Sequence, residues 1–593
     1  MEVSKSSLKS PSHSSSSSTA ENSTLSNQQA TACASNNALS NADEKKLESE
    51  SSDSHTENGS PVYAAIRPGI RPAKPTADML DSASSTLSRR QSLGAQSIEL
   101  ALRQERSNNG YGVDNLPTPT ELEAQNKYDP AFTVDWEDGD NDPECPRSMP
   151  TWRKWWIISL VSLCSLGVST YEQMVDEFKV SRNLVSVGLS LYVLGLGLGP
   201  MLLSPLSEFY GRRPIYLGSW LMFTIWLIPS AVAKNIETML IARFFDGFSG
   251  SAFLAVAGGT VGDLFNKREL QAPMLMYSTA PFTGPTLGPL IGSFINYNVD
   301  WRWTYYTMLI MSGILLIFLV FQVPETYHPV LLRNRARKLR QETGDQRWIA
   351  SIEKQNKSLV KTLITSLYRP FQLLFYEIMV LNLCIYSAIL LGILYLFFGA
   401  FPQIFTAIHN FNLWQNGLTF LGMLTGILLC SLFDPLWKRI RNDLIAKSER
   451  ETGVVGRSEP EWRLPSAIVG AIFVPIGLFW FAWTTYHSIH WSVPIIGSAF
   501  FGGGSLLVFS GIFTFLVDAY PLYAASALAA NSFVRCTAAA AFPLFGHQMF
   551  DRLGFQWAGS LIAFLALAMM PFPYLFFKYG KRLRAKSRFA VSD

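Results

Sequence analysis

Long runs of apolar residues alternate with short polar gaps along most of this chain. A helix that crosses about 30 Å of hydrocarbon needs roughly 20 such residues, because it rises about 1.5 Å per residue. From Trp155 onward the runs form two sets of six, separated by a polar stretch from Pro324 to Pro370. They begin near Trp155, Val185, Ile215, Met239, Ala272, Tyr305, Phe375, Leu418, Ser466, Val493, Tyr523 and Trp557. The pattern predicts an all-α polytopic membrane protein with two six-helix halves that form an internal repeat.

The first 150 residues follow a different pattern. The segment "SHSSSSSTAENSTLSNQQATACASNNALSN" has few large apolar side chains and cannot bury enough surface to offset its ordering entropy. The start, "MEVSKSSLKSPSHSSSSS", has no apolar core, which argues against a cleaved signal peptide. Farther on, "YDPAFTVDWEDGDNDPECPRSMPTWRKWW" passes from acids and prolines to aromatics and cations, as expected of an ordered lead-in to a membrane surface.

Lys and Arg residues are distributed unevenly over the predicted loops. With the N-terminus inside, the inner loops and the C-terminal tail contain Arg212, Arg213, Lys267, Arg268 and the segments "LLRNRARKLR", "LWKRIRNDLIAKSER" and "KYGKRLRAKSR". The outer loops contain Lys234, Arg302 and Arg552 at most. Because cations accumulate in cytoplasmic loops, this asymmetry predicts that both termini are cytoplasmic.

These observations predict six regions along the chain. They are a disordered cytoplasmic tail (1–130), a pre-membrane segment (131–154), an N-terminal six-helix bundle (155–323), a cytoplasmic central loop (324–373), a C-terminal six-helix bundle (374–578) and a basic cytoplasmic tail (579–593). Within the first region, "SRRQSLGAQS" places two arginines shortly before Ser92, a pattern that suits a basophilic kinase. A plain solvated tail is the alternative, because such matches are common by chance.

The composition excludes several classes of protein. Only 16% of the 593 residues are charged, whereas a soluble protein carries about a quarter. The net charge of +4 gives no support to nucleic-acid binding. The six cysteines form no CxxC pair, which argues against a disulfide framework and a zinc site. The chain also lacks an H-E-x-x-H, P-loop or G-x-S-x-G motif placed to work, so we expect neither catalytic residues nor a metal site.

Several sequence motifs lie in or beside the predicted helices. They are "SPLSEFYGRRPIY" between helices 2 and 3, "ARFFDGFSG" in helix 4, "APFTGPTLGPLIG" in helix 5, "DWRWTYY" and "PETY" around helix 6, and "VDAYPLYAASALAANSFVRCTAAAAFPLFG" in helices 10 and 11. The first three resemble motifs A, B and C of the major facilitator superfamily. Together the motifs cover the whole twelve-helix region and resemble the fungal drug:proton antiporter family of that superfamily.

The resemblance implies a fold and a function. The fold would be two six-helix bundles around a central cavity. The protein would be a monomer that works by alternating access, uses the proton gradient rather than a cofactor, and expels drugs, fungicides or toxic amphiphilic or cationic molecules. Its location would be the plasma membrane, with the vacuolar membrane as the alternative.

Motif A places an acid and two arginines in a short inner loop. The resemblance implies a conformational latch formed by Glu208, Gly211, Arg212 and Arg213, with Asp263 at the inner end of helix 4 as partner. Glu208 stands where the family has aspartate, and Ser204 where it has glycine. The alternative is that the arginines only fix the topology, because exposed ion pairs are worth less than about 1 kcal/mol.

Motif B places Arg243 inside an apolar run. An unpaired cation within the membrane costs at least about 2.5 kcal/mol, so Arg243 should face a cavity or a partner. Asp246 lies one helical turn away and shares roughly its face, which makes it a candidate proton site. The carry-over from the family holds for Arg243 and Gly247 but not for Asp246, where the family has glutamine. The alternative is a frayed helix end in which both charges are wet.

Motif C contributes glycines and prolines to helix 5. Gly284 and Gly288 lie on one helix face and allow a neighbouring helix to approach closely, while Pro285 and Pro289 each remove an amide. The resemblance implies a kink-and-contact surface that favours export over leakage, although Pro289 replaces the last glycine of the family motif. A generic packing kink is the alternative.

Other polar and aromatic residues are candidates for the substrate path. Asn531 and Arg535 lie four apart amid apolar residues on helix 11, where helix packing is the competing interpretation. The aromatics of "YLFFGAFPQIF" in helix 7 and "GLFWFAW" in helix 9 could line a large apolar cavity, although each one taken singly fits lipid contact or core packing better.

The first apolar run is shorter than in the resembled family. It reaches Glu172 after about 17 residues and continues to Asp176, so helix 1 lacks roughly two turns. Membrane thinning can accommodate a short span, the short span can draw both acids inward, or the sequence lacks a small exon.

Two rival functions remain open at this stage. Within transport, the rival is polyamine or nutrient movement, although motif C argues against uptake and no ring of acids suits a polyamine. From another class, the rival is a transporter-derived sensor that signals through its long tail. The intact motifs A, B and C argue against that, since a sensor need not keep the parts that couple protons. In every case the expected partners are small molecules, protons and the lipid bilayer.

Overall fold

A computed structural model describes residues 132–163, 172–265, 271–353, 359–453, 458–520 and 523–585, together with residues 587 and 589–590. The predicted disordered tail with Ser92 lies outside these residues, as do the cations Lys267 and Arg268. Residues 164–171 also lie outside them, so the predicted shortening of helix 1 is not tested.

The N-terminal half contains the six predicted helices. They are α4 (Thr151–Leu163), followed by the short α5 (Glu172–Phe178), α6 (Arg182–Tyr210), α7 (Arg212–Ala231), α8 with α9 (Ile236–Gly250, Ala252–Leu264), α10 (Gln271–Asn298) and α11 (Arg302–Gln322). Two of these helices, α6 and α8, begin just after a polar side chain that caps them. Ser181 accepts a hydrogen bond from the backbone N–H of Leu184, and Asn235 accepts one from that of Thr238.

The C-terminal half repeats this organisation. Its helices are α14 (Ile378–His409), α15 (Leu413–Leu432), α17 (Pro465–Thr484), α18 (Ser492–Ala519), α19 (Ala524–Met569) and α20 (Pro571–Arg584). Within α19 the backbone leaves the helical region at Gly554, with a φ of 76° that glycine adopts without penalty. Gln556 then contacts Thr485, just after α17, and Arg584 contacts Glu461, just before α17, so the chain reverses at Gly554 into the twelfth span.

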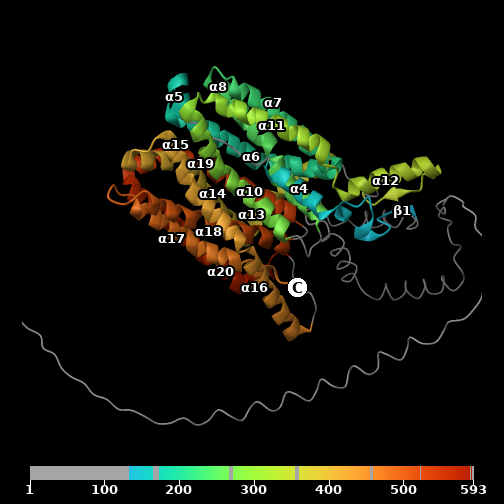
Figure 1. Ribbon diagram of the computed structural model, residues 1–593. Coiled ribbons are helices and arrows are strands. Elements are labelled where there is room, and N and C mark those ends of the chain that lie inside the picture. The colour runs from blue at the N-terminus through green and yellow to red at the C-terminus, as the bar shows by residue number, and fades with distance from the viewer. Residues whose placement is uncertain are drawn as a thin grey trace, which may run out of the picture. The chain divides into compact units, whose positions relative to one another are not determined.

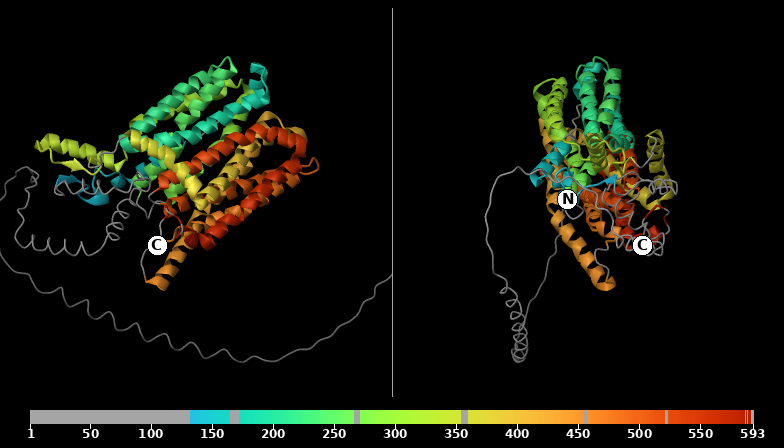
Figure 2. Two further views of the ribbon diagram at one scale, coloured as in Figure 1. Left: turned by 180° about the vertical axis from the view of Figure 1, so that it is seen from behind. Right: turned by 90° about the vertical axis from the view of Figure 1, so that its right-hand side faces the viewer.

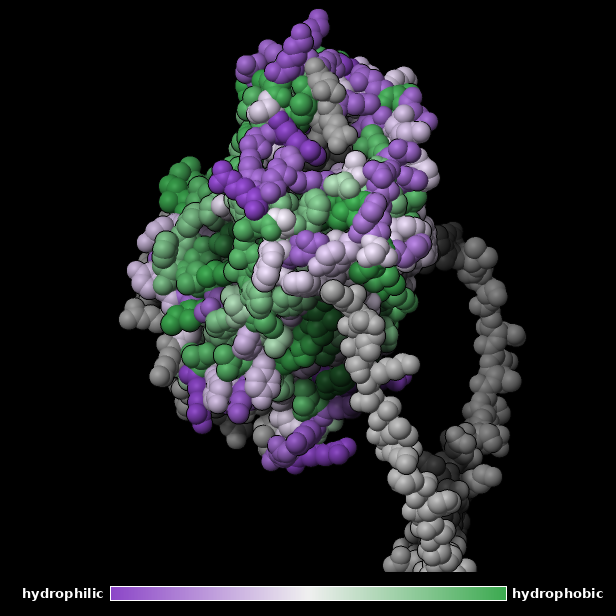
Figure 3. Space-filling view, turned by 90° about the vertical axis from the view of Figure 1, so that its left-hand side faces the viewer, coloured by the Kyte–Doolittle hydropathy of each residue, from purple (hydrophilic) through white to green (hydrophobic). Residues whose placement is uncertain are grey.

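Membrane crossing is consistent with these lengths. In the described part of the chain, nine helical stretches are long and apolar enough to span a bilayer, and one of them, Ala524–Arg584, contains the reversal at Gly554. Large apolar side chains such as Ile241, Ile310 and Phe321 are exposed along these helices. In Figure 3, hydrophobic residues cover much of the visible surface between groups of hydrophilic ones. An exposed apolar surface of this extent suits contact with lipid.

The polar segments outside the spanning helices are more structured than plain loops. They contain the helices α12 (His328–Thr343), α13 (Leu359–Tyr376) and α16 (Asp434–Thr452), the short helices η2 (Gly139–Asn141), η3 (Pro146–Ser148) and η4 (Pro460–Arg463), and the strands β1 (Thr133–Val134) and β2 (Ile349–Ala350). The pre-membrane segment is ordered, as expected, because β1 pairs in parallel with β2 of the central region. Arg335 of α12 strengthens this attachment through Asp142 and Glu137, at 2.8 and 2.7 Å.

The two halves meet along two pairs of helices. One is α6 with α19, where a Cβ atom on Gly197 would lie 2.7 Å from the Cβ of Cys536. The other is α10 with α15. Figure 1 shows α6, α7, α8 and α11 side by side in one group and α14, α17, α18 and α20 in another, and Figure 2 shows both groups from behind. Small residues at the crossings let helix backbones approach closely.

The aromatic runs of α14 and α17 form core rather than cavity wall. Phe401 stacks on Phe481 with ring centroids 5.2 Å apart, and it also contacts Phe397, Phe405 and Phe420. All five rings are almost completely buried. Four of these rings, Phe397, Phe401, Phe405 and Phe481, come from the two predicted runs, and core packing rather than a cavity wall accounts for each of them. Mutual packing of the rings removes more apolar surface than an open cavity would.

Candidate functional site

Motif A forms a buried network at one end of the N-terminal half. Arg212 opens α7 and directs its Nε at Asp263 of α9, 3.1 Å from Oδ2. Its Nη1 donates to the Ser207 hydroxyl at 2.7 Å, and its guanidinium lies over the Tyr327 ring. Arg212 and Asp263 are each 3% exposed, so solvent screens their attraction little. The network is thus more than the exposed topology marker of the alternative hypothesis.

Glu325, which follows α11, also belongs to this network. Its two carboxylate oxygens accept the backbone N–H groups of Arg212 and Arg213, at 2.8 and 3.1 Å. These N–H groups begin α7 and have no partner inside the helix, so the carboxylate caps it. The contact requires Gly211, which has a φ of 104° and whose Cβ, if present, would lie 2.3 Å from Glu325.

The remaining motif A residues divide into buried and exposed positions. Glu208 is buried beside Arg212, whereas Arg213 is exposed and donates to the backbone oxygen of Val320. A Cβ on Gly259 of α9 would lie 2.6 Å from the Arg212 guanidinium, so this glycine makes room for it. Arg213 lies at an exposed position, where a role in fixing the membrane topology accounts for it. The other predicted residues, Glu208, Gly211, Arg212 and Asp263, lie together in one cluster.

His328 connects this cluster to the pre-membrane segment. Its Nε2 donates to the backbone oxygen of Asp263 at 2.9 Å, and its Nδ1 accepts from the Trp136 indole at 3.1 Å. Both ring nitrogens are therefore used by the neutral form. Burial lowers the pKa of His328 below its ordinary value. Protonation would remove the acceptor that Trp136 needs.

The C-terminal half has a corresponding network. Arg463, just before α17, pairs with Asp518 near the end of α18 at 2.7 Å, as Arg212 at the start of α7 pairs with Asp263 near the end of α9. Glu461 pairs with Arg584 of the last helix at 2.7 Å, and both are buried. In the N-terminal half the acid Glu325 follows the last helix and meets the start of α7. Here the last helix supplies the cation, Arg584, and the acid, Glu461, precedes α17. The internal repeat predicted from the helix count extends to these ion pairs.

Motif B places its charges in the interior of the N-terminal half. Arg243 is 7% exposed and donates to the hydroxyl of Tyr305, with its guanidinium also over the rings of Tyr305 and Tyr192. Asp246 is fully buried, and its Oδ2 accepts from the Ser230 hydroxyl at 2.9 Å. Neither residue lies at a wet, frayed helix end. Asp246 Oδ1 has no hydrogen-bond partner among the described residues, which leaves this oxygen open to a proton.

Gly247 has a packing function beside these charges. A Cβ atom there would lie 1.9 Å from the backbone oxygen of Tyr192 on α6. A Cβ on Gly195 of α6 would likewise lie 2.4 Å from the backbone oxygen of Phe244. The two glycines let α6 and α8 touch, which brings Tyr192 over Arg243.

Motif C lies within α10, which the prolines at 281, 285 and 289 do not interrupt. Gly284, Gly288 and Pro289 are buried, and Pro285 is partly buried. The contact partner is α15 of the other half, because a Cβ on Gly417 would lie 3.1 Å from the backbone oxygen of Pro289 and 2.7 Å from Ser293. Pro289 thus lies at an interface between the halves, and a close helix contact at Gly284 and Gly288 stays a prediction.

The two candidate residues of helix 11 are both buried in α19. Asn531 donates to the Ser387 hydroxyl at 3.0 Å, which ties α19 to α14. Arg535 is 8% exposed, and its guanidinium lies 5.1 Å from the ring of Phe513 and 5.8 Å from that of Phe509. Asn531 Oδ1 and Arg535 Nε have no hydrogen-bond partner in the described part of the chain.

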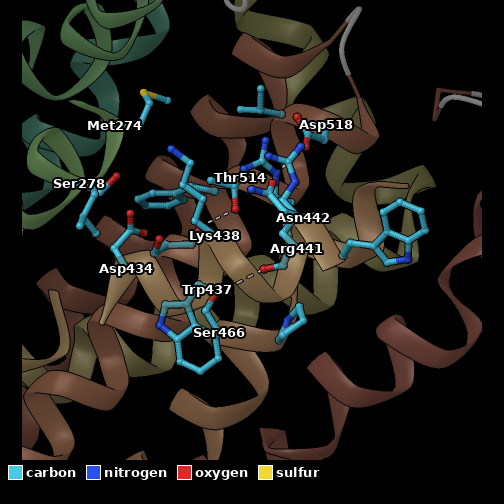
Figure 4. A pocket seen from close by; sticks show the side chains of 17 residues that line it. Met274, Ser278, Asp434, Trp437, Lys438, Arg441, Asn442, Ser466, Thr514 and Asp518 are labelled. Atoms are coloured by element: carbon cyan, nitrogen blue, oxygen red, sulfur yellow. Dashed lines mark hydrogen bonds and ion pairs between the residues drawn. The ribbon is translucent and has the colours of Figure 1, made fainter. Parts of the chain in front are cut away.

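A pocket of about 360 Å³ lies where α10 faces the C-terminal half. Figure 4 shows Met274 and Ser278 on one side, with Lys438, Arg441 and Asp518 on the other. Its wall also includes Trp437 and Phe513. Trp437 Nε1 and Arg441 Nε have no hydrogen-bond partner among the described residues. In those same residues, no group of three or more His, Cys, Asp or Glu side chains could hold a metal ion.

Sequence reasoning missed Glu325, His328, Glu461 and Arg584. "PETY" was noted only as a family feature, although an acid after a span can cap a neighbouring helix. No sequence signal pairs Glu461 with Arg584, which are 123 residues apart. The side chains of Glu172 and Asp176 are not among those described, so their displacement into the membrane stays one of the open alternatives for helix 1.

Comparison with known proteins gives consistent results. Residues 155–543 match the family model described as Major Facilitator Superfamily. The chain is 54% identical over 452 residues to a protein named efflux pump atB from Aspergillus terreus (strain NIH 2624 / FGSC A1156), covering 76% of this chain and 89% of the relative. It is 40% identical over 518 residues to the probable drug/proton antiporter YHK8 of Saccharomyces cerevisiae (strain ATCC 204508 / S288c), covering 84% and 98%.

Solved structures agree on the fold. The proton:xylose symporter XylE, bound to 6-bromo-6-deoxy-D-glucose, superposes with a TM-score of 0.51 and 16% identity, covering 73% of this chain and 96% of that one. At this identity the likeness concerns the fold alone.

Proposed function

Because this chain belongs to the major facilitator superfamily, we propose that it is a proton-driven exporter of small amphiphilic molecules. Two relatives, named an efflux pump and a probable drug/proton antiporter, support export coupled to protons. We further propose that the protein works as a monomer, without a cofactor.

The observation that carries proton coupling is the buried carboxyl of Asp246. One of its oxygens accepts from Ser230 and the other has no partner among the described residues, while Arg243 lies one turn away in the same interior. A carboxylate in such a place is expensive unless it is paired or protonated. Binding and release of a proton on Asp246 would therefore change the balance of charge around Arg243 during each cycle.

The two ion-pair networks would make each half move as a unit. Arg212, Asp263 and Glu325 join the ends of α7, α9 and α11 within one half. Arg463 and Asp518 join the corresponding ends in the other. Rocking of two rigid halves about the α6–α19 and α10–α15 contacts would then expose the path to either side. In this proposal the latch of motif A holds the helices of its own half together.

We place the end of the bundle that carries α12 and α16 in the cytoplasm. The support is the cation bias of the sequence and the position of the basic helices α12 and α16 after spanning helices α11 and α15. The membrane would be the plasma membrane, with the vacuolar membrane as the alternative, and kinases would act on the N-terminal tail.

Efflux of a fluorescent drug tests the function. Cells that carry the protein and cells with an empty vector are loaded with the dye, and retention is followed with and without a protonophore. We expect faster loss from the carrying cells, and the protonophore should abolish the difference. Equal retention under both conditions would rule out proton-driven export of the dye, and faster uptake would favour the nutrient or polyamine alternative.

A further inference from the structure

The buried arginine of helix 11 differs from the other fully buried arginines that pair with acids. Arg212 faces Asp263 and Arg584 faces Glu461, each within 3.1 Å. Arg535 is about as buried as these, but its described contacts include no acidic side chain within ion-pair distance. A cation without a counter-charge is costly in such an environment, so the position calls for an anion from elsewhere.

The surroundings of Arg535 suit the anion of an apolar molecule. The rings of Phe509 and Phe513 lie beside the guanidinium, and its Nε is open to an acceptor. An aromatic molecule with one carboxylate would accept a hydrogen bond from the guanidinium, and its apolar part would pack against the two rings.

The pocket in Figure 4 shares one aromatic ring with the surroundings of Arg535. Phe513 lines it, and this is the ring on which the Arg535 guanidinium lies. At its rim are Lys438, Arg441 and Arg463, against Asp434 and Asp518. The unpaired N–H groups of Trp437 and Arg441 are two further donors. A volume of about 360 Å³ is within the range of small-ligand sites.

We propose that the exported substrate is a small amphiphilic carboxylate, which enters at the basic rim of this pocket and whose negative charge is received by Arg535. This proposal rests on the proposed export function and specifies its substrate class. It departs from the expectation of a cationic substrate, because the described polar atoms without partners along this path include three nitrogen donors, on Trp437, Arg441 and Arg535.

Binding of two probes that differ only in charge tests the proposal. Purified full-length protein is titrated at pH 7 with 2-naphthoate and with its neutral amide, 2-naphthamide, and tryptophan fluorescence reports binding. We expect the carboxylate to bind at least about tenfold more tightly, because a charge-assisted hydrogen bond replaces a neutral one. Arg535→Gln should remove most of this preference, and Arg535→Lys should keep part of it.

The control is Arg552→Gln, which changes an exposed arginine of the same helix and should leave the preference intact. Equal binding of the two probes by the unaltered protein would overturn the proposal, even if Arg535→Gln does not fold. An unchanged preference in a folded Arg535→Gln would also overturn it. Failure of the export function is distinct, because it appears as equal dye retention in carrying and empty-vector cells, whatever the probes do.

Discussion

The guanidinium of Arg212 and the carboxylate of Asp263 lie 3.1 Å apart, each 3% exposed, at the ends of two neighbouring helices. Motif A thus contributes Arg212 to a buried ion pair and does not form a surface patch of charges. The glycines at 211 and 259 leave the space in which the guanidinium and the capping carboxylate of Glu325 fit.

Removal of one partner of this pair should destabilise the protein strongly. Asp263→Asn removes the carboxylate that pairs with the buried Arg212 guanidinium, so we expect a loss of about 3–5 kcal/mol. Thermal unfolding of the full chain in detergent measures it. The control, Arg213→Gln, alters the exposed neighbour and should change stability by no more than about 0.5 kcal/mol. A loss of the same size in both variants would contradict a specific role of the buried pair.

Gly211 and Gly218 lie seven residues apart and give a matched test of the Glu325 cap. Gly211→Ala forces a side chain into a backbone with φ of 104° and against the Glu325 carboxylate. We expect a loss of at least about 1 kcal/mol. Gly218→Ala should be neutral or stabilising, because a Cβ there meets nothing within 4 Å and helical alanine is favoured. The same unfolding assay compares them, and equal effects would refute the close approach of Glu325.

His328 predicts a fall of stability in mild acid. Its pKa is lowered in the folded protein by burial, so near and below the ordinary value of 6.5 the unfolded chain binds a proton that the folded chain does not. Stability therefore falls as pH decreases below about 6.5, by at most about 1.4 kcal/mol per pH unit for one proton. Unfolding temperatures at pH 7.5 and 5.5 measure the slope.

The variant His328→Gln should reduce this slope, because glutamine does not titrate. His490→Gln, at an exposed position in the loop before α18, is the control and should leave the slope as it is. If His328→Gln retained the full pH dependence, the source of the acid sensitivity would lie elsewhere.

Asp246→Asn tests the proton site. Asparagine keeps the size of the side chain and can still accept from Ser230, but it cannot exchange a proton. We expect export to fall to the level of empty-vector cells while surface expression and dye binding persist. The control is Asp443→Asn, the same chemical change at an exposed position of α16. Export that survives in Asp246→Asn would remove this residue from the proton path.

The twelve spans followed from the sequence because apolar runs of spanning length have few other structures open to them in a bilayer. Predicted starts such as Val185, Leu418 and Val493 fall within a few residues of the start of α6, α15 and α18. The family resemblance likewise implied Asp263 as a partner of motif A, and the structure pairs it with Arg212. Asp246 also stood out, because a charge inside an apolar run is visible without a structure.

Only the tertiary structure decided which side chains meet across long separations. Glu325 caps α7 from 113 residues away, and Glu461 pairs with Arg584 from 123 residues away. The aromatics of α14 and α17 pack on one another, whereas a sequence pattern cannot separate core from cavity wall. Arg535 is the clearest case. Its sequence position showed a polar residue amid apolar ones, but its lack of a described acidic partner depends on the helices packed around it. Periodicity fixes which residues become helical, while packing determines which charges are left without a counter-ion.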